Sequence, residues 1–139
     1  MAARSSIGDA LFLRSFESGD VSPSDFNHRG HLRLAYTYLC EFDVDSAYAK
    51  MKISIQSFLN RNNIDADNYH ETMTKAWVQA VRHFIEMAGD TESFEEFIVF
   101  DKRLLDTEIM LSHYSRERLF LSHARSCYLP PDLQAIPSY

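Results

Sequence analysis

Apolar residues recur along much of the chain at steps of three and four, which is the spacing of one face of a helix. This pattern predicts amphipathic helices over residues 6–18, 27–41, 44–60 and 68–88. In the second of these segments the inward stripe consists of His28, His31, Leu32, Ala35, Tyr38 and Leu39. Two histidines therefore continue the line of residues that should face the core.

The same pattern continues more weakly in the last third of the chain. It predicts a fifth helix over residues 91–105, a loop over 106–112 and a sixth helix that Ser115 caps and that runs to about Cys127, before Pro130 and Pro131. The predicted fold class is all-α: a single-domain antiparallel helical bundle of about five to six helices. One domain should span residues 1–139, with extended or flexible ends at 1–5 and 132–139.

Composition narrows the classes of protein to which the chain can belong. The net charge of −6 argues against nucleic-acid binding, which needs a basic face. No apolar run reaches the roughly 18 residues of a membrane span. Cys40 and Cys127 lack metal-ligand spacing, and we expect buried, reduced thiols and a cytoplasmic location. The oligomeric state stays open, with a homodimer among the options.

Three histidines are expected to converge at one end of this bundle. If successive helices alternate in direction, the helices that begin near His28 and His70 run parallel, and their N-terminal ends meet. His28, His31 and His70 would then share a site, and the start of the sixth helix would bring His113, Tyr114 and Arg118 to the same end. His83 lies about 20 Å further along its helix than His70, at 1.5 Å per residue, and is excluded on distance.

Clustered imidazoles suggest a metal-dependent enzyme that acts on a small molecule. His28 and His31 are three residues apart on one helix face, and His70 would be the third ligand of a divalent transition metal. We favour iron, with oxygen chemistry, over zinc, copper or nickel. Candidate catalytic residues are Glu71, Thr74 and Tyr114, and candidate substrate-binding residues are Trp77, His113 and Arg118.

Two other functions fit the same residues. The first is metal-free binding of a small molecule, or acid–base catalysis by His70 with Glu71 or Tyr69. The second is a helical interaction module in which the histidines are structural. A histidine on an apolar face is often a satisfied core residue, and the spacing of His28 and His31 is not that of a zinc protease.

Four short patterns, taken together, resemble a group of small bacterial helical proteins. They are His28-x-x-His31-Leu32, Tyr69-His70-x-Thr72-x-Thr74-x-x-Trp77, Tyr114-Ser115-x-x-x-Leu119 and Pro131-Asp132-Leu133. The resemblance runs from about Phe26 to Pro137. It implies a compact helical domain and draws attention to the histidines, but it assigns no reaction.

Overall fold

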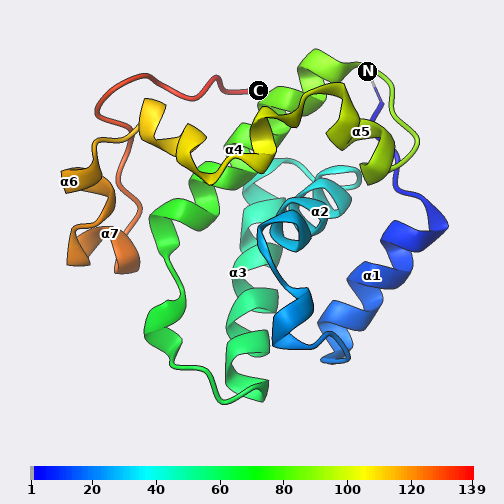
Figure 1. Ribbon diagram of the computed structural model, residues 1–139, viewed down its shortest axis with the longest axis horizontal. Coiled ribbons are helices and arrows are strands. Elements are labelled where there is room, and N and C mark those ends of the chain that lie inside the picture. Colours follow the sequence, from blue (N-terminus) through cyan, green and yellow to red (C-terminus); the bar gives the residue numbers. More distant parts are fainter. Residues whose placement is uncertain (1) are drawn as a thin grey trace.

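The computed structural model describes residues 2–139, and this part of the chain folds into helices joined by short links (Figure 1). The longer helices are α1 (Ile7–Ser18), α2 (His28–Leu39), α3 (Val44–Arg61) and α4 (Glu71–Ala88). Short helices complete the chain: α5 (Phe94–Phe100), α6 (Arg116–Leu119), α7 (Ser122–Ser126), and the 3-10 helices η1 (Pro23–Asp25), η2 (Ala66–Asn68), η3 (Lys102–Leu105) and η4 (Thr107–Ser112). The all-α prediction is confirmed.

Local capping explains why the first helices begin where the sequence predicts. Ser6 forms a capping box with Asp9 at the start of α1. The side chain of Asn27 accepts a hydrogen bond from the Gly30 N–H, and Asp43 does the same for Ser46 at the start of α3. These bonds satisfy backbone donors that a helix leaves free at its first turn.

The predicted helix over residues 68–88 is too long at its start. α4 begins at Glu71, and His70 is its N-cap, with extended backbone. The imidazole takes the place that a serine or aspartate usually occupies, which residue-type preferences do not anticipate.

The predictions for residues 91–127 are wrong in detail. The backbone of Asp101 is extended (φ −149°, ψ 110°) and separates α5 from η3, where its carboxylate accepts a hydrogen bond from the Arg103 N–H. The expected loop over 106–112 is instead largely helical, as η4. Extended backbone at Leu121 likewise divides the expected sixth helix into α6 and α7. At Asp101 a polar cap outweighs the apolar period, whereas the break at Leu121 has no side-chain cap.

Helices α2, α3 and α4 pack against one another and enclose the core. Figure 1 shows α2 nearly end-on and passing across α3, while α3 descends and α4 rises in the same view. The largest fully buried side chains include Tyr36 and Tyr38 of α2. Because α2 has core on several sides, its eight buried residues cover more than one stripe of the helix surface.

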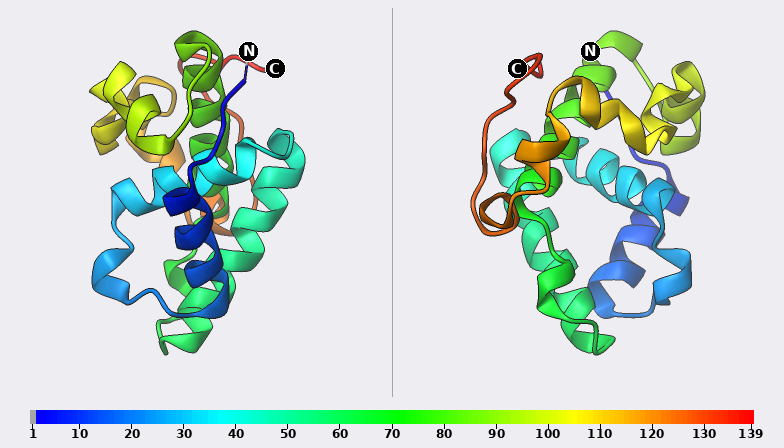
Figure 2. Two further views of the ribbon diagram at one scale, coloured as in Figure 1. Left: turned by 90° about the vertical axis from the view of Figure 1, so that its right-hand side faces the viewer. Right: turned by 60° about the vertical axis from the view of Figure 1, so that its left-hand side comes forward.

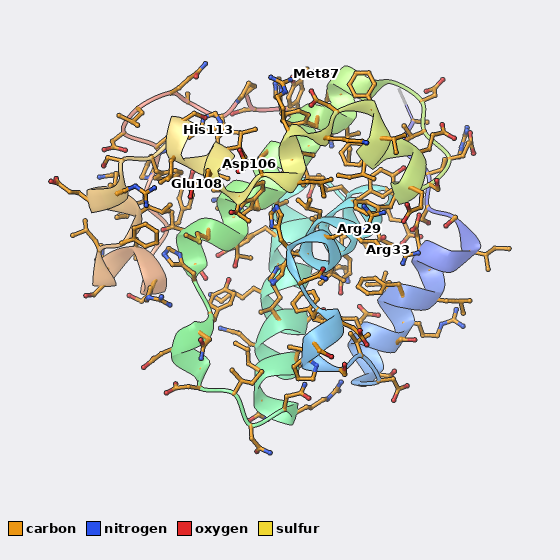
Figure 3. All side chains as sticks on the ribbon, viewed as in Figure 1. Arg29, Arg33, Met87, Asp106, Glu108 and His113 are labelled. Carbon is orange, nitrogen blue, oxygen red and sulfur yellow. The ribbon has the colours of Figure 1, made fainter. Side chains whose placement is uncertain are left out.

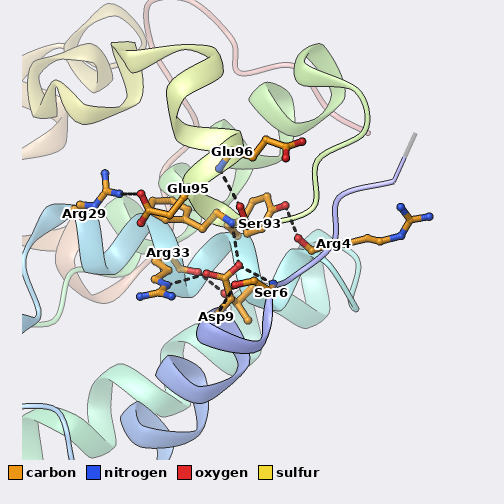
Figure 4. A network of polar contacts seen from close by, with 11 residues as sticks. Arg4, Ser6, Asp9, Arg29, Arg33, Ser93, Glu95 and Glu96 are labelled. Atoms are coloured by element: carbon orange, nitrogen blue, oxygen red, sulfur yellow. Dashed lines mark hydrogen bonds and ion pairs between the residues drawn. The ribbon is translucent and has the colours of Figure 1, made fainter.

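A buried carboxylate joins three helices near the start of the chain (Figure 4). Asp9 is 0% exposed and accepts hydrogen bonds from the backbone N–H groups of Ser6 and Phe94. Nε of Arg33 donates to its other oxygen at 2.9 Å. Asp9 thereby links α1, α2 and α5.

Both ends of the described chain lie against the body. Ala3 forms a single parallel bridge with Thr91. The tail after α7 is extended, as predicted, and the Leu133 N–H donates to the His113 carbonyl at 2.9 Å. In the right-hand view of Figure 2 this red segment runs along one side of the molecule.

Among residues 2–139, no helix is long and apolar enough to cross a membrane.

The prediction that both cysteines are buried is wrong, because Cys127 is exposed and Cys40 is only half-buried. Burial still raises the pKa of the Cys40 thiol to about 12.

Candidate functional site

A cavity of about 510 Å³ lies between α2, α3, α4 and the short helices near the end of the chain. Its wall is mainly apolar and aromatic: Phe26, Leu32, Ala35, Met51, Ile55, Met73, Trp77, Met110, Leu111, Leu119 and Phe120. Its polar lining residues are Asn27, His28, His31, Asn68, Tyr69, His70, Thr74, Thr107, Glu108 and Arg116. The cavity therefore brings together five of the predicted site residues: His28, His31, His70, Thr74 and Trp77.

His31 is the imidazole most available to a ligand. Its ring stacks against Phe26 with the centroids 4.0 Å apart, and neither ring nitrogen has a hydrogen-bond partner within residues 2–139. Burial, and then the neighbouring His28, lower the pKa of His31 to about 4. The ring is therefore neutral near pH 7, with one nitrogen able to accept and the other to donate.

Gly30 allows Phe26 to lie this close to the start of α2. A Cβ atom at Gly30 would lie 3.3 Å from Cδ1 of Phe26 and 3.4 Å from the Asp25 carbonyl oxygen. Gly30 therefore permits the close approach of an aromatic ring to the first turn of α2.

His28 lines the cavity, but its ring already has a hydrogen-bond partner. Its Nε2 lies 2.8 Å from the carbonyl oxygen of Leu104 in η3. Because a carbonyl only accepts, Nε2 carries the proton and donates. The ring also meets Trp77 edge-on at 4.7 Å, so His28 helps to hold the only tryptophan of the chain in place.

His70 has partners for both of its nitrogens. Nδ1 accepts from the Met73 N–H at 3.1 Å, and Nε2 donates to the carbonyl of Leu119 at 3.0 Å. Burial lowers the pKa of His70, which keeps the ring in this neutral form. The hydroxyl of Thr74 donates to the His70 carbonyl at 2.8 Å. These contacts connect the first turn of α4 to α6.

The expected metal centre is not assembled from these side chains. Within residues 2–139, no three His, Cys, Asp or Glu side chains form a group that could hold a metal ion. A metal at the histidines stays a prediction. It would require His28 and His70 to exchange their backbone partners for the ion.

Glu71 lies in a different, more polar pocket beside the cavity. This pocket of about 290 Å³ is lined by Lys52, Gln56, Ala66, Asp67, Tyr69, Glu71, Arg125 and Ser126. Glu71 accepts a hydrogen bond from the Tyr48 hydroxyl and pairs with Nζ of Lys52 at 3.2 Å. Burial alone would raise the pKa of Glu71, but these two contacts outweigh it and lower the pKa.

The three candidates near the sixth predicted helix hold the tail and do not line the cavity. Nδ1 of His113 lies 2.7 Å from the Gln134 carbonyl, and the Tyr114 hydroxyl donates to the Leu129 carbonyl at 2.7 Å. Nε of Arg118 donates to the Pro130 carbonyl at 2.6 Å. The structure thus brings none of the three together with His31.

The sequence reasoning missed the residues that form the outer part of the cavity. Arg116 of α6 pairs with Glu108 of η4 at 3.1 Å, and both side chains are largely exposed. Figure 3 labels Asp106, Glu108 and His113 along this segment. The segment 106–112 was expected to be a loop, so no signal placed Glu108 near the histidines.

Tyr69 is a second residue whose environment the pattern did not indicate. Its side chain lines both pockets, and its hydroxyl is buried without a hydrogen-bond partner in the described part of the chain. Burial raises the pKa of this phenol. Tyr69 therefore forms a neutral wall between the two pockets.

No protein-family model, curated protein or solved structure matches this chain.

Proposed function

We propose that the cavity binds a small, mainly apolar molecule without a metal, and that His31 is the polar contact of that molecule. A volume of about 510 Å³ is within the range of small-molecule sites, which are typically apolar with a few convergent polar groups. The single observation that carries the proposal is the unpaired imidazole of His31 in a mainly apolar wall. A polar group that the fold itself does not satisfy is available to a ligand.

The state of the other histidines supports binding over metal chemistry. His28 and His70 donate hydrogen bonds to the carbonyls of Leu104 and Leu119, so both rings stabilise contacts between helices. The metal-dependent enzyme would first have to break these bonds. Acid–base catalysis by His70 with Glu71 is also less favoured, because Glu71 points to the neighbouring polar pocket.

Titration with 1-octanol tests the proposal directly. Trp77 is the only tryptophan and lines the cavity, so its fluorescence reports on occupancy. Burial of an alkyl chain gives about 0.8 kcal/mol per methylene. We therefore expect saturable binding with a dissociation constant between about 1 mM and about 1 µM. A linear, non-saturating response would overturn the proposal.

A pair of substitutions locates the binding site. Leu111 lines the cavity, whereas Leu105, in the neighbouring 3-10 helix, does not and is 38% exposed. Leu111→Trp should reduce octanol binding about tenfold or more by filling the space, and Leu105→Trp should leave it unchanged. Both variants are measured by calorimetry, with circular dichroism to confirm folding. Equal affinities in the two variants would place the octanol elsewhere.

A further inference from the structure

The ionisable groups of the cavity lining include no free carboxylate. The basic side chains are His28 and His31 of α2, His70 at the start of α4, and Arg116 of α6. The one carboxylate in the lining is Glu108 of η4, and it is already paired with Arg116. α3 contributes only Met51 and Ile55 to the wall, and Tyr69 stays neutral. A cationic ligand would therefore find no free acidic partner in this wall.

The start of α2 is a second feature of the lining that favours an anion. Asn27 and His28, at the N-terminal end of the helix, line the cavity together with His31. The N-terminal end of a helix carries partial positive charge and favours an anion. His31 lies one turn inside this end, lines the cavity and forms no side-chain hydrogen bond within residues 2–139.

We propose that the natural ligand is a monocarboxylic acid with an apolar body, and that its carboxyl group binds the imidazole of His31 with uptake of one proton. This inference rests on the proposed function of the cavity. The apolar body lies among Met51, Ile55 and Met73, and the carboxyl group lies at the His31 end.

The proton balance of this step is simple. A free carboxylate is ionised near pH 7, as Asp and Glu side chains are. Free His31 is neutral there, because burial lowers its pKa to about 4. In the complex, one proton from the solvent lies between a carboxylate oxygen and an imidazole nitrogen. No covalent bond forms or breaks, and the complex gains a charge-assisted hydrogen bond.

Octanoate and 1-octanol form a matched pair of probes, because they have the same chain length and differ in the headgroup. Calorimetry near pH 7, in two buffers of different ionisation enthalpy, should give an uptake of about one proton per octanoate and none for octanol. The octanoate dissociation constant should rise about tenfold per pH unit above neutrality, and the octanol constant should stay level. Octanoate binding without proton uptake would overturn the inference.

Substitution of His31 separates the headgroup from the chain. His31→Phe keeps a ring against Phe26 but removes both nitrogens. Octanoate loses a charge-assisted hydrogen bond and should bind about tenfold more weakly or worse, whereas octanol loses only a neutral one and should weaken by a smaller factor, about threefold. His123→Phe, at an exposed position, is the control and should change neither.

The outcomes distinguish the two claims. If octanol binds in the cavity but octanoate binds without dependence on His31, the carboxylic acid is wrong and the binding site stands. If neither probe binds, the proposed function falls as well.

Discussion

At the scale of single residues, the polar groups that the fold buries are almost all hydrogen-bonded, and within residues 2–139 the exception is the Tyr69 hydroxyl. Asp9 is the fullest example, with two backbone N–H groups and one guanidinium directed at a carboxylate that is 0% exposed. Burial alone would raise the pKa of Asp9. The hydrogen bonds from Ser6 and Phe94, and the charge of Arg33, outweigh burial and lower that pKa below 3.8.

Asp9→Asn should therefore destabilise the protein by roughly 3 kcal/mol at pH 7, because it leaves Arg33 without its charge partner. The folded-state pKa of Asp9 lies below its value in the unfolded chain. Its contribution is thus fully present above about pH 4 and is lost as pH falls through the folded-state pKa. Urea unfolding from neutral to acid pH should show this loss in the wild type and not in the variant.

The exposed Asp45 provides the control for this measurement. Asp45→Asn should change the free energy of unfolding by no more than about 0.5 kcal/mol. If Asp9→Asn and the wild type lost stability in parallel at acid pH, the role given to Asp9 would be wrong.

At the scale of elements, the ends of the helices are set by a few backbone positions. Gly19 ends α1 in the left-handed region with φ of 86°, and its N–H bonds back to the carbonyls of Ser15 and Phe16. A Cβ atom there would lie 2.8 Å from Nη1 of Arg61, which itself donates to the Glu17 carbonyl. Gly19 is thus needed both for its backbone angle and for the contact between α1 and α3.

Gly19→Ala and Gly8→Ala should have opposite effects on stability. The first should cost about 1–2 kcal/mol, from the strained backbone and the clash with Arg61. The second lies in the first turn of α1, where a Cβ would lie 3.3 Å from Nη2 of Arg33 and 3.7 Å from Oγ of Ser6, and should gain up to about 1 kcal/mol. Thermal unfolding of the two variants checks the signs, and a loss in both would contradict this account of α1.

At the scale of the whole molecule, the last third of the chain closes one side of the cavity. Its extended tail then forms hydrogen bonds with the body of the protein. η4 and α6 provide the Glu108–Arg116 pair in the cavity lining. The extended tail forms hydrogen bonds with residues at the ends of these two elements. Ser115 illustrates this, because Asp132 accepts hydrogen bonds from both its N–H and its hydroxyl. Stability of the tail and binding in the cavity are therefore separable.

Tyr114→Phe should reveal that separation. The Tyr114 hydroxyl donates a hydrogen bond to the Leu129 carbonyl. Its removal should lower the free energy of unfolding, measured with urea, by about 1–2 kcal/mol. The ring is outside the cavity lining, so the octanol dissociation constant should change less than about twofold. A large loss of octanol affinity would show that the tail controls the cavity.

The sequence by itself determined the four longer helices, because their apolar period and their caps at Ser6, Asn27 and Asp43 are local. It also indicated that His28, His31 and His70 face inward, and all three line the cavity. The expected parallel course of their helices is not the reason, because α2 is nearly end-on in the view of Figure 1 in which α4 rises. The sequence pattern did not predict the breaks at Asp101 and Leu121. The apolar period is weaker in this part of the chain, and the backbone is extended at both positions.

Only the tertiary structure decided which imidazole is free. The carbonyls that occupy His28 and His70 belong to Leu104 and Leu119, which lie 76 and 49 residues away along the chain. No local pattern can indicate partners at such separations, because they depend on how η3 and α6 pack over α2 and α4. Three equivalent histidines in the sequence thus become two structural ones and one, His31, whose ring lines a mainly apolar cavity and forms no hydrogen bond within residues 2–139.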